Sequence, residues 1–312
     1  MSLLHEERDF ADLLAVTGRK LSIDPSLVEK DYWLMHSLWG LQQLGKKFEL
    51  KGGTSLSKGF GIIHRFSEDI DIRIEPTTAL PTGPNHDKPQ HAAARKQFYD
   101  DLAATIVIPG FVSAERDTAF DDERYRSGGV RLLYNGVNPL PKGVKEGVLL
   151  EAGFDQVAPN RPCDISSWAF DAALEAGLVG LTDNRALQVP CYEPGYTLVE
   201  KLQTISTKFR KQQQTGEMPQ NFMRHYYDVY CLLDDASVRA FMGSQDYIAH
   251  KSRRFPAADD KNISKNEAFV LSDPAVRSAY ATAYAATSAL YFRGQPPFED
   301  LLARIRTDAD KL

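Results

Sequence analysis

The sequence of 312 residues has few cysteines, no long apolar run and no excess of positive charge. Its three cysteines, Cys163, Cys191 and Cys231, form no C-x-x-C pair, which argues against a zinc knuckle or a disulfide framework and favours free thiols in a reducing compartment. No window approaches 18 consecutive apolar residues, so we expect no membrane-spanning helix. Met1–Phe10 is charged and lacks an apolar stretch, which predicts no secretory signal and a cytoplasmic protein.

Charge and motif content exclude further classes. Lys plus Arg is 37 and Asp plus Glu is 42, so the net charge is −5 and the protein is not basic throughout. Two segments, 200–211 and 250–254, are nevertheless locally basic. The histidines show no transition-metal ligand spacing. No G-x-S-x-G hydrolase motif and no Walker A motif occurs.

Hydrophobic residues make up 43% and charged residues 25%, as in ordinary globular proteins. Apolar periodicity predicts an α+β protein, in which a mixed α/β region is followed by an all-α region. We expect a helical segment over 1–45, an α/β domain over 46–190 and a helical domain over 191–312. In chain order, these regions should contain the following elements: a helix over 26–44, a short helix over 56–60 capped by Thr54 or Ser55, a strand over 69–74, a helix over 90–105, a hairpin of 129–134 and 147–154, an irregular stretch over 155–195, and helices over 196–214, 220–235 and onward to 312.

One constellation suggests chemistry. The turn Gly52-Gly53-Thr54-Ser55 precedes a short helix, and its backbone N–H groups suit a triphosphate. Asp69 and Asp71 alternate with isoleucines, which places both carboxylates on one face of a strand. Such carboxylates repel each other unless a cation or proton lies between them, and Mg²⁺ prefers oxygen ligands. Alone, the first motif is typical of a turn and the second of a solvated strand; together they predict a phosphate cradle beside a metal clamp.

The run Lys51-Gly-Gly-Thr-Ser-Leu-Ser-Lys-Gly-Phe-Gly-Ile-Ile-His-Arg-Phe-Ser-Glu-Asp-Ile-Asp-Ile and the upstream Glu29-Lys-Asp-Tyr-Trp-Leu resemble the AbiEii/AbiGii nucleotidyltransferase toxins of the DNA polymerase β-like superfamily. Glu200-Lys-Leu-x-x-Ile-x-x-Lys-x-Arg resembles the family's K-L-x-A-x-x-x-R helix, and Arg224-His-Tyr-Tyr-Asp resembles its R-D-x-Y-D-L helix. The resemblance covers residues 26–235. It departs at Ile205, where a small residue is usual, and at His225, which replaces an Asp and leaves the role of that position open.

The resemblance implies roles for individual residues. It implies a third carboxylate beside Asp69 and Asp71, for which Glu151 is our candidate and Asp155 the alternative; Glu151 can equally be an ordinary strand residue. It adds Lys51 to the nucleotide-binding turn and implies that Lys201 contacts the triphosphate, although a lysine row is usually a solvated face. It makes Asp228 a site residue that orients Lys201, the alternative being an ion pair with Arg224 within the helix. Arg65 either binds phosphate or caps the turn.

Together these features predict a Mg²⁺-dependent nucleotidyltransferase that moves a nucleoside monophosphate from a nucleoside triphosphate (NTP) to an acceptor and releases pyrophosphate. The resemblance implies a toxin of a toxin–antitoxin or abortive-infection pair with a cognate antitoxin, and it makes the 3′ end of tRNA one candidate acceptor. A protein or small-molecule hydroxyl is another candidate acceptor. A non-catalytic nucleotide- or antitoxin-binding module is the alternative from a different class.

Overall fold

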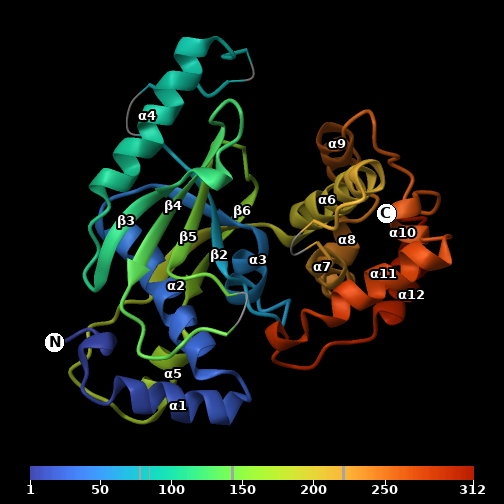
Figure 1. The fold of residues 1–312 in the computed structure, drawn as a ribbon. Helices are drawn as coiled ribbons and strands as arrows, with labels where there is room; N and C mark the ends of the chain where they lie inside the picture. Colours follow the sequence, from blue (N-terminus) through green and yellow to red (C-terminus); the bar gives the residue numbers. More distant parts are fainter. Residues whose placement is uncertain (77–78, 84, 142–143, 220–221) are drawn as a thin grey trace. The chain divides into compact units, whose positions relative to one another are not determined.

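A computed structural model describes residues 1–76, 79–83, 85–141, 144–219 and 222–312 (Figure 1). The chain forms two compact units. The first consists of residues 1–59 and 67–192, and the second of residues 60–66 and 193–312. We expected residues 60–66 to belong with the α/β part, but this segment joins the helical unit. The reason is that Arg65 bridges to the backbone of Tyr291 and binds the side chain of Asp228.

The first unit is built on a mixed sheet, as predicted for an α+β protein. In the described residues it has seven strands in the order β3-β4-β5-β2-β1-β7-β6. The pairs β2/β5 and β1/β7 are parallel, and the other neighbouring pairs are antiparallel. The strands are β1 Phe48–Lys51, β2 Asp69–Ile74, β3 Phe111–Asp117, β4 Ser127–Tyr134, β5 Val148–Gly153, β6 Asn160–Ile165 and β7 Ala186–Tyr192.

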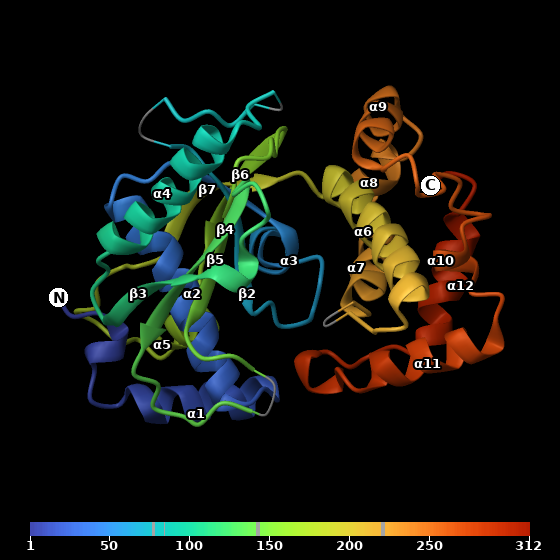
Figure 2. The same cartoon turned by 45° about the horizontal axis from the view of Figure 1, so that its top comes forward.

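Helices and short helical turns cover this sheet and connect its strands: α1 Phe10–Leu21, α2 Pro25–Gln43, α3 Gly52–Thr54, α4 Pro89–Thr105, α5 Trp168–Glu175, 3₁₀ turns at Leu4–Glu6 and Thr118–Phe120, and a π-helical segment Ser55–Gly59. The predicted start of α2 is confirmed, because Asp24 accepts a hydrogen bond from the N–H of Ser26 and Pro25 fills the first helical position. α1 and α5 pack beside α2, which also contacts β5 and β7 (Figures 1 and 2).

Three local predictions differ from the structure. The helix after β1 begins at Gly52 rather than near residue 56, so neither Thr54 nor Ser55 caps it. The stretch 155–195 is not irregular: it contains β6, α5 and β7. Its prolines are tolerated because β6 is an edge strand, where Pro162 lies opposite Pro190, and because β7 pairs with β1 only at Leu50 and Cys191. Strand β3, at the other edge, was not predicted.

The second unit is helical in its described residues: α6 Pro194–Thr215, α7 Arg224–Leu232, α8 Ala236–Phe241, α9 Gln245–Arg254, α10 Glu267–Val270, α11 Pro274–Ala285, α12 Phe298–Asp308 and a 3₁₀ turn at Ser288–Leu290. α6 confirms the predicted helix over 196–214. The helix predicted over 220–235 is α7, and residues 220 and 221 lie outside the described residues. None of the helices in the described part of the chain is long and apolar enough to cross a membrane.

Candidate active site

A row of charged side chains crosses three neighbouring strands of the first unit. In the strand register Asp71 of β2 lies opposite Lys51 of β1 on one side and Glu151 of β5 on the other. Directly paired residues project to the same face of a sheet, and Asp69, two residues earlier on β2, shares that face. The alternating isoleucines of β2 are buried on the opposite face, in the core. Three carboxylates and one ammonium therefore gather on one face.

The electrostatics of this row are those of crowded carboxylates. Burial, and then the negative charge of Asp71, raise the pKa of Glu151 to about 7 from its ordinary 4.5, and Asp69 adds to the effect. Lys51 opposes the shift but does not cancel it. At neutral pH the face therefore favours either a proton on Glu151 or a cation between the carboxylates. The alternative third carboxylate, Asp155, is exposed and lies beyond the end of β5.

The glycine turn is fitted closely to these carboxylates. Gly52 has a φ of +69°, and a Cβ at this position would lie 2.0 Å from Oδ2 of Asp71. Only glycine combines this backbone conformation with so close an approach. Thr54 is buried, and its hydroxyl donates to the carbonyl oxygen of Asp69 at 2.6 Å. Ser55 is also buried. The hydroxyl of Thr54 thus ties the turn to strand β2, and the turn offers a ligand its backbone rather than this side chain.

The residues of this face fit Mg²⁺ in one particular way. Among the described residues, no group of three or more His, Cys, Asp or Glu side chains is arranged to hold a metal ion. Mg²⁺ does not need such a cage, since it commonly takes one or two carboxylates together with water and substrate phosphates. Asp71 with Asp69 or Glu151 meets that requirement. The donor set therefore fits Mg²⁺ that enters together with a phosphate-bearing ligand.

The predicted residues of the helical unit form a separate cluster around Asp228. This carboxylate is fully buried on α7; Arg65 donates to both of its oxygens at 2.7 and 2.8 Å, and Nζ of Lys201 on α6 lies 2.9 Å from Oδ2. Burial alone would raise the pKa of Asp228, but Arg65 and then Lys201 hold it well below its usual range. Both cations come from outside α7, and the Arg65 guanidinium faces Asp228 and the Phe66 carbonyl oxygen.

His225, at the position where the motif resemblance implies an Asp, has a lysine at each ring nitrogen. Its Nδ1 is 3.5 Å from Nζ of Lys201, and its Nε2 is 3.3 Å from Nζ of Lys208. Burial, followed by the charges of the two lysines, lowers its pKa well below the usual range. The imidazole is therefore neutral at physiological pH and adds no charge to this cluster.

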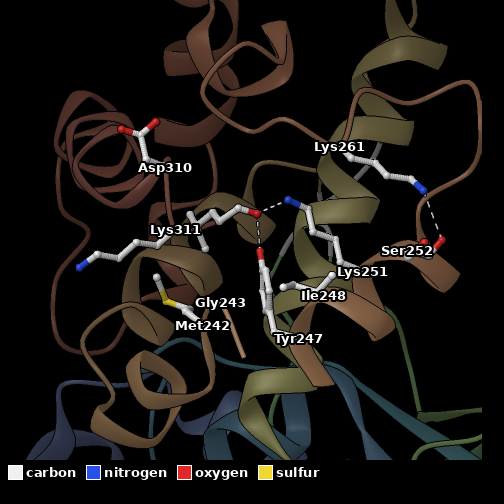
Figure 3. A pocket seen from close by; sticks show the side chains of 10 residues that line it. Met242, Gly243, Tyr247, Ile248, Lys251, Ser252, Lys261, Asp310 and Lys311 are labelled. Atoms are coloured by element: carbon white, nitrogen blue, oxygen red, sulfur yellow. Dashed lines mark hydrogen bonds between the residues drawn. The ribbon is translucent and has the colours of Figure 1, made fainter. Parts of the chain in front are cut away.

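The basic segment 250–254 lies on α9 and borders a cavity of about 620 Å³ (Figure 3). Lys251 and the Tyr247 hydroxyl both donate to a main-chain oxygen of Leu312, and Lys261 reaches the Ser252 carbonyl oxygen. Arg254 lies 3.4 Å from the Glu200 carboxylate. Much of this local positive charge is thus engaged within the unit.

The structure therefore brings Lys51, the glycine turn, Asp69, Asp71 and Glu151 together in one unit, and Arg65, Lys201 and Asp228 together in the other. It also reveals buried charged residues to which sequence reasoning gave no mechanism, Glu29, Lys30 and Asp31 on α2, and a partner of one of them, Lys58. The sequence contains one signal of their burial: they lie in a helix between apolar residues such as Val28 and Tyr32.

A mixed sheet that presents paired carboxylates beside a glycine turn is the arrangement expected of enzymes that transfer nucleotidyl groups. Over residues 33–304 the chain matches the family described as "Nucleotidyl transferase AbiEii toxin, Type IV TA system". The chain belongs to this family, which confirms the resemblance inferred from its motifs. No curated protein and no solved structure matches it. The family describes nucleotidyltransferase toxins of a type IV toxin–antitoxin system.

Proposed function

We propose that this protein is a Mg²⁺-dependent nucleotidyltransferase toxin that transfers a nucleoside monophosphate from an NTP to an acceptor hydroxyl and releases pyrophosphate. The observation that supports this most directly is the carboxylate face. Asp71 and Glu151 lie opposite each other on parallel strands, with Asp69 on the same face, and the pKa of Glu151 is raised to about 7. A bound cation would stabilise carboxylates that are crowded in this way.

In this proposal Asp69 and Asp71 hold Mg²⁺, and Glu151 either completes the metal site or accepts the proton of the acceptor hydroxyl. Bound Mg²⁺ supplies neutralisation of the charge that develops on the transferring phosphate. Gly52, Gly53, Thr54 and Ser55 hold the triphosphate through their backbone, and Lys51 contributes positive charge. The result is positioning and electrostatic stabilisation of an in-line displacement.

The residues of the helical unit enter the proposal through charge. Lys201 stabilises phosphate oxygens as a compact ammonium group. Asp228 fixes the position of that ammonium, and Arg65 in turn fixes Asp228 through two hydrogen bonds. Arg65 is therefore proposed to act on the nucleotide through Asp228 rather than by direct contact.

The acceptor and the partner are proposed at the level of class. RNA is our first candidate acceptor, with the 3′ end of tRNA implied by the family resemblance; a protein or small-molecule hydroxyl is the alternative. Binding of RNA should weaken with salt, because lysine and arginine side chains would displace the counterions that surround the RNA phosphates. The family's description implies an antitoxin that neutralises the protein. A non-catalytic nucleotide- or antitoxin-binding module is the second candidate function, and the neutral His225 in place of an Asp is the observation that favours it.

The test is incubation with Mg²⁺, each α-labelled NTP in turn, and total cell RNA, cell protein or small metabolites as acceptor. We expect label to enter RNA with the wild-type protein and to disappear with Asp69→Ala. Label in protein or metabolites would replace the RNA acceptor. No transfer with any nucleotide or acceptor, although nucleotide still binds, would favour the binding module.

A further inference from the structure

Helix α2 buries three consecutive charged residues. Glu29, Lys30 and Asp31 expose only 2%, 1% and 2% of their surface. Charged side chains are almost never buried to this extent unless each has a specific partner. Glu29 accepts hydrogen bonds from the N–H groups of Val137 and Asn138 at 2.8 and 3.0 Å. Lys30 donates to the Lys145 carbonyl oxygen. Glu29 and Lys30 thus both reach the connection between β4 and β5.

Asp31 reaches the segment that follows the glycine turn. Nζ of Lys58 lies 2.9 Å from Oδ1 and 3.0 Å from Oδ2 of Asp31, and it stands 4.7 Å from the centre of the Trp168 ring. The N–H of Trp168 also donates to Asp31, at 2.8 Å. Asp31 is thus held by the first residue of α5 and by Lys58, which share its Oδ2.

The ion pair with Asp31 is made by a residue that lies close to the glycine turn. Lys58 lies in the π-helical segment Ser55–Gly59, directly after the turn proposed to hold the triphosphate. Single turns of π-helix are rare and often occur at functional sites. The start of the segment is fixed by Gly52 against Asp71 and by the hydroxyl of Thr54 on the Asp69 carbonyl oxygen. Its end is fixed by Lys58 on Asp31.

Stability alone is a poor explanation for this ion pair. Burial raises the pKa of Asp31, and the attraction of Lys58 does not offset it. A carboxylate in this situation costs free energy to keep ionised, and buried ion pairs often stabilise a fold less than apolar residues of the same size would. A directional ion pair also restrains where the Lys58 side chain can lie, and so limits the movement of the segment that carries it.

We propose that Asp31 and Lys58 are positioning residues: their ion pair holds the Gly52–Gly59 segment in the conformation that binds the triphosphate of the substrate. The inference rests on the proposed function, because it assumes that this segment contacts phosphate. Neither residue needs to contact the nucleotide. Removing the ion pair should loosen the segment and weaken nucleotide binding, while the sheet that carries the carboxylates stays intact.

The test compares Asp31→Asn with the matched control Glu175→Gln in the full-length protein. Asn keeps the shape and the acceptor for the Trp168 N–H but removes the charge. Glu175 belongs to the same unit and pairs with Lys20 at the surface, with side chains 64% and 62% exposed. We expect amide hydrogen exchange of residues 52–59 to rise about tenfold in Asp31→Asn, with exchange in β5 unchanged. We expect the Kd for Mg²⁺-NTP to rise about tenfold, equivalent to about 1.4 kcal/mol. Glu175→Gln should change neither.

Lys58 supplies the second pair of variants, which also serves if Asp31→Asn does not fold. Lys58→Met should reproduce both effects from the more exposed end of the ion pair, and Lys58→Arg, which keeps the charge, should restore most of the wild-type behaviour. A purely structural role would instead lower the melting temperature and raise exchange throughout the sheet, with the Kd of the folded protein unchanged.

The outcomes separate this inference from the proposed function. Unchanged exchange over 52–59 in both Asp31→Asn and Lys58→Met overturns the positioning role whether or not nucleotide binds. Raised exchange with an unchanged Kd also overturns it. A wild-type protein that binds none of the four Mg²⁺-NTPs refutes the proposed function and, with it, the role of the ion pair in nucleotide binding.

Discussion

Replacing Asp228 by Asn should destabilise the helical unit strongly. The carboxylate is 0% exposed and carries two buried cations, Arg65 on both oxygens and Lys201 on one. The Asn side chain keeps the size but removes the compensating charge, so two positive groups stay buried without it. Breaking a buried ion pair from one side costs about 3–5 kcal/mol. With a urea m-value of about 2 kcal/mol/M, the midpoint of unfolding should fall by about 1.5–2.5 M.

The three tryptophans, Trp33, Trp39 and Trp168, all lie in the first unit, which makes the assay selective. Circular dichroism at the helix band follows the helices of both units, whereas tryptophan fluorescence follows the first unit alone. A transition that appears in circular dichroism but not in fluorescence should therefore report the loss in the helical unit. The pH dependence has a definite sign. Because the pKa of Asp228 lies below its ordinary 3.8 in the folded state, its stabilising contribution is fully present above pH 3.8 and is lost as the pH falls below 3.8 and through the lower folded-state pKa. The difference between wild type and variant should therefore shrink in acid.

Glu299→Gln is the matched control in the same unit. Glu299 pairs with Arg277 at the surface, where its side chain is 56% exposed, and such pairs contribute about 0–1 kcal/mol. A loss below about 1 kcal/mol for Asp228→Asn at pH 7, equal to that of the control, would refute the role assigned to the buried cluster.

Three further predictions concern the carboxylate face and the turn. In metal-free protein, Glu151→Gln should raise the free energy of unfolding at pH 8 by about 1–3 kcal/mol and give little gain at pH 4, measured by urea unfolding in EDTA. The reason is that a pKa of about 7 in the folded state, in place of 4.5, makes the wild-type protein lose stability as the pH rises from 4.5 through 7. An equal effect at both pH values would contradict the crowding of the carboxylates. Gly52→Ala should lower the free energy of unfolding by about 1–3 kcal/mol and abolish nucleotidyl transfer, because the added Cβ would collide with the Asp71 carboxylate. An active, stable variant would show that the close approach of Gly52 to Asp71 is not required. Asp71→Ala should abolish growth inhibition on expression while the purified protein keeps its circular dichroism spectrum, and persistent toxicity would exclude the proposed chemistry.

Local patterns predicted the elements that position the carboxylates. The alternation of Asp and Ile over 69–74 predicted β2 and its polar face, because a strand with one buried face has a period of two. The helix predicted over 26–44 is α2, and its ends carry local signals: Asp24-Pro25 at the start and Gly45, with a positive φ, just after the end. The sequence motifs also predicted the family.

Features that depend on contacts distant in sequence were not predictable. The pairing of Asp71 with Glu151 joins strands 80 residues apart, and only the register shows that the two carboxylates are direct neighbours. Strands β6 and β7 were missed because prolines normally interrupt strands. The features that tolerate them, the edge position of β6 and the short pairing of β7 with β1, are tertiary properties. Glu29, Lys30 and Asp31 are residue types that ordinarily lie on a helix surface. They are buried here because segments far along the chain supply their partners.

Pyrophosphate release by Asp71→Asn, compared with Asp155→Asn, tests the carboxylate site most directly. Both substitutions remove one charge, but Asp71 lies in the row beside Glu151 whereas Asp155 is exposed beyond β5. With Mg²⁺, the preferred NTP and its acceptor, we predict that Asp71→Asn loses at least about 100-fold in rate, the scale expected for a group that stabilises transition-state charge. Asp155→Asn should keep the wild-type rate. Full activity in Asp71→Asn, or an equal loss in both variants, would contradict the assignment of this face as the catalytic site.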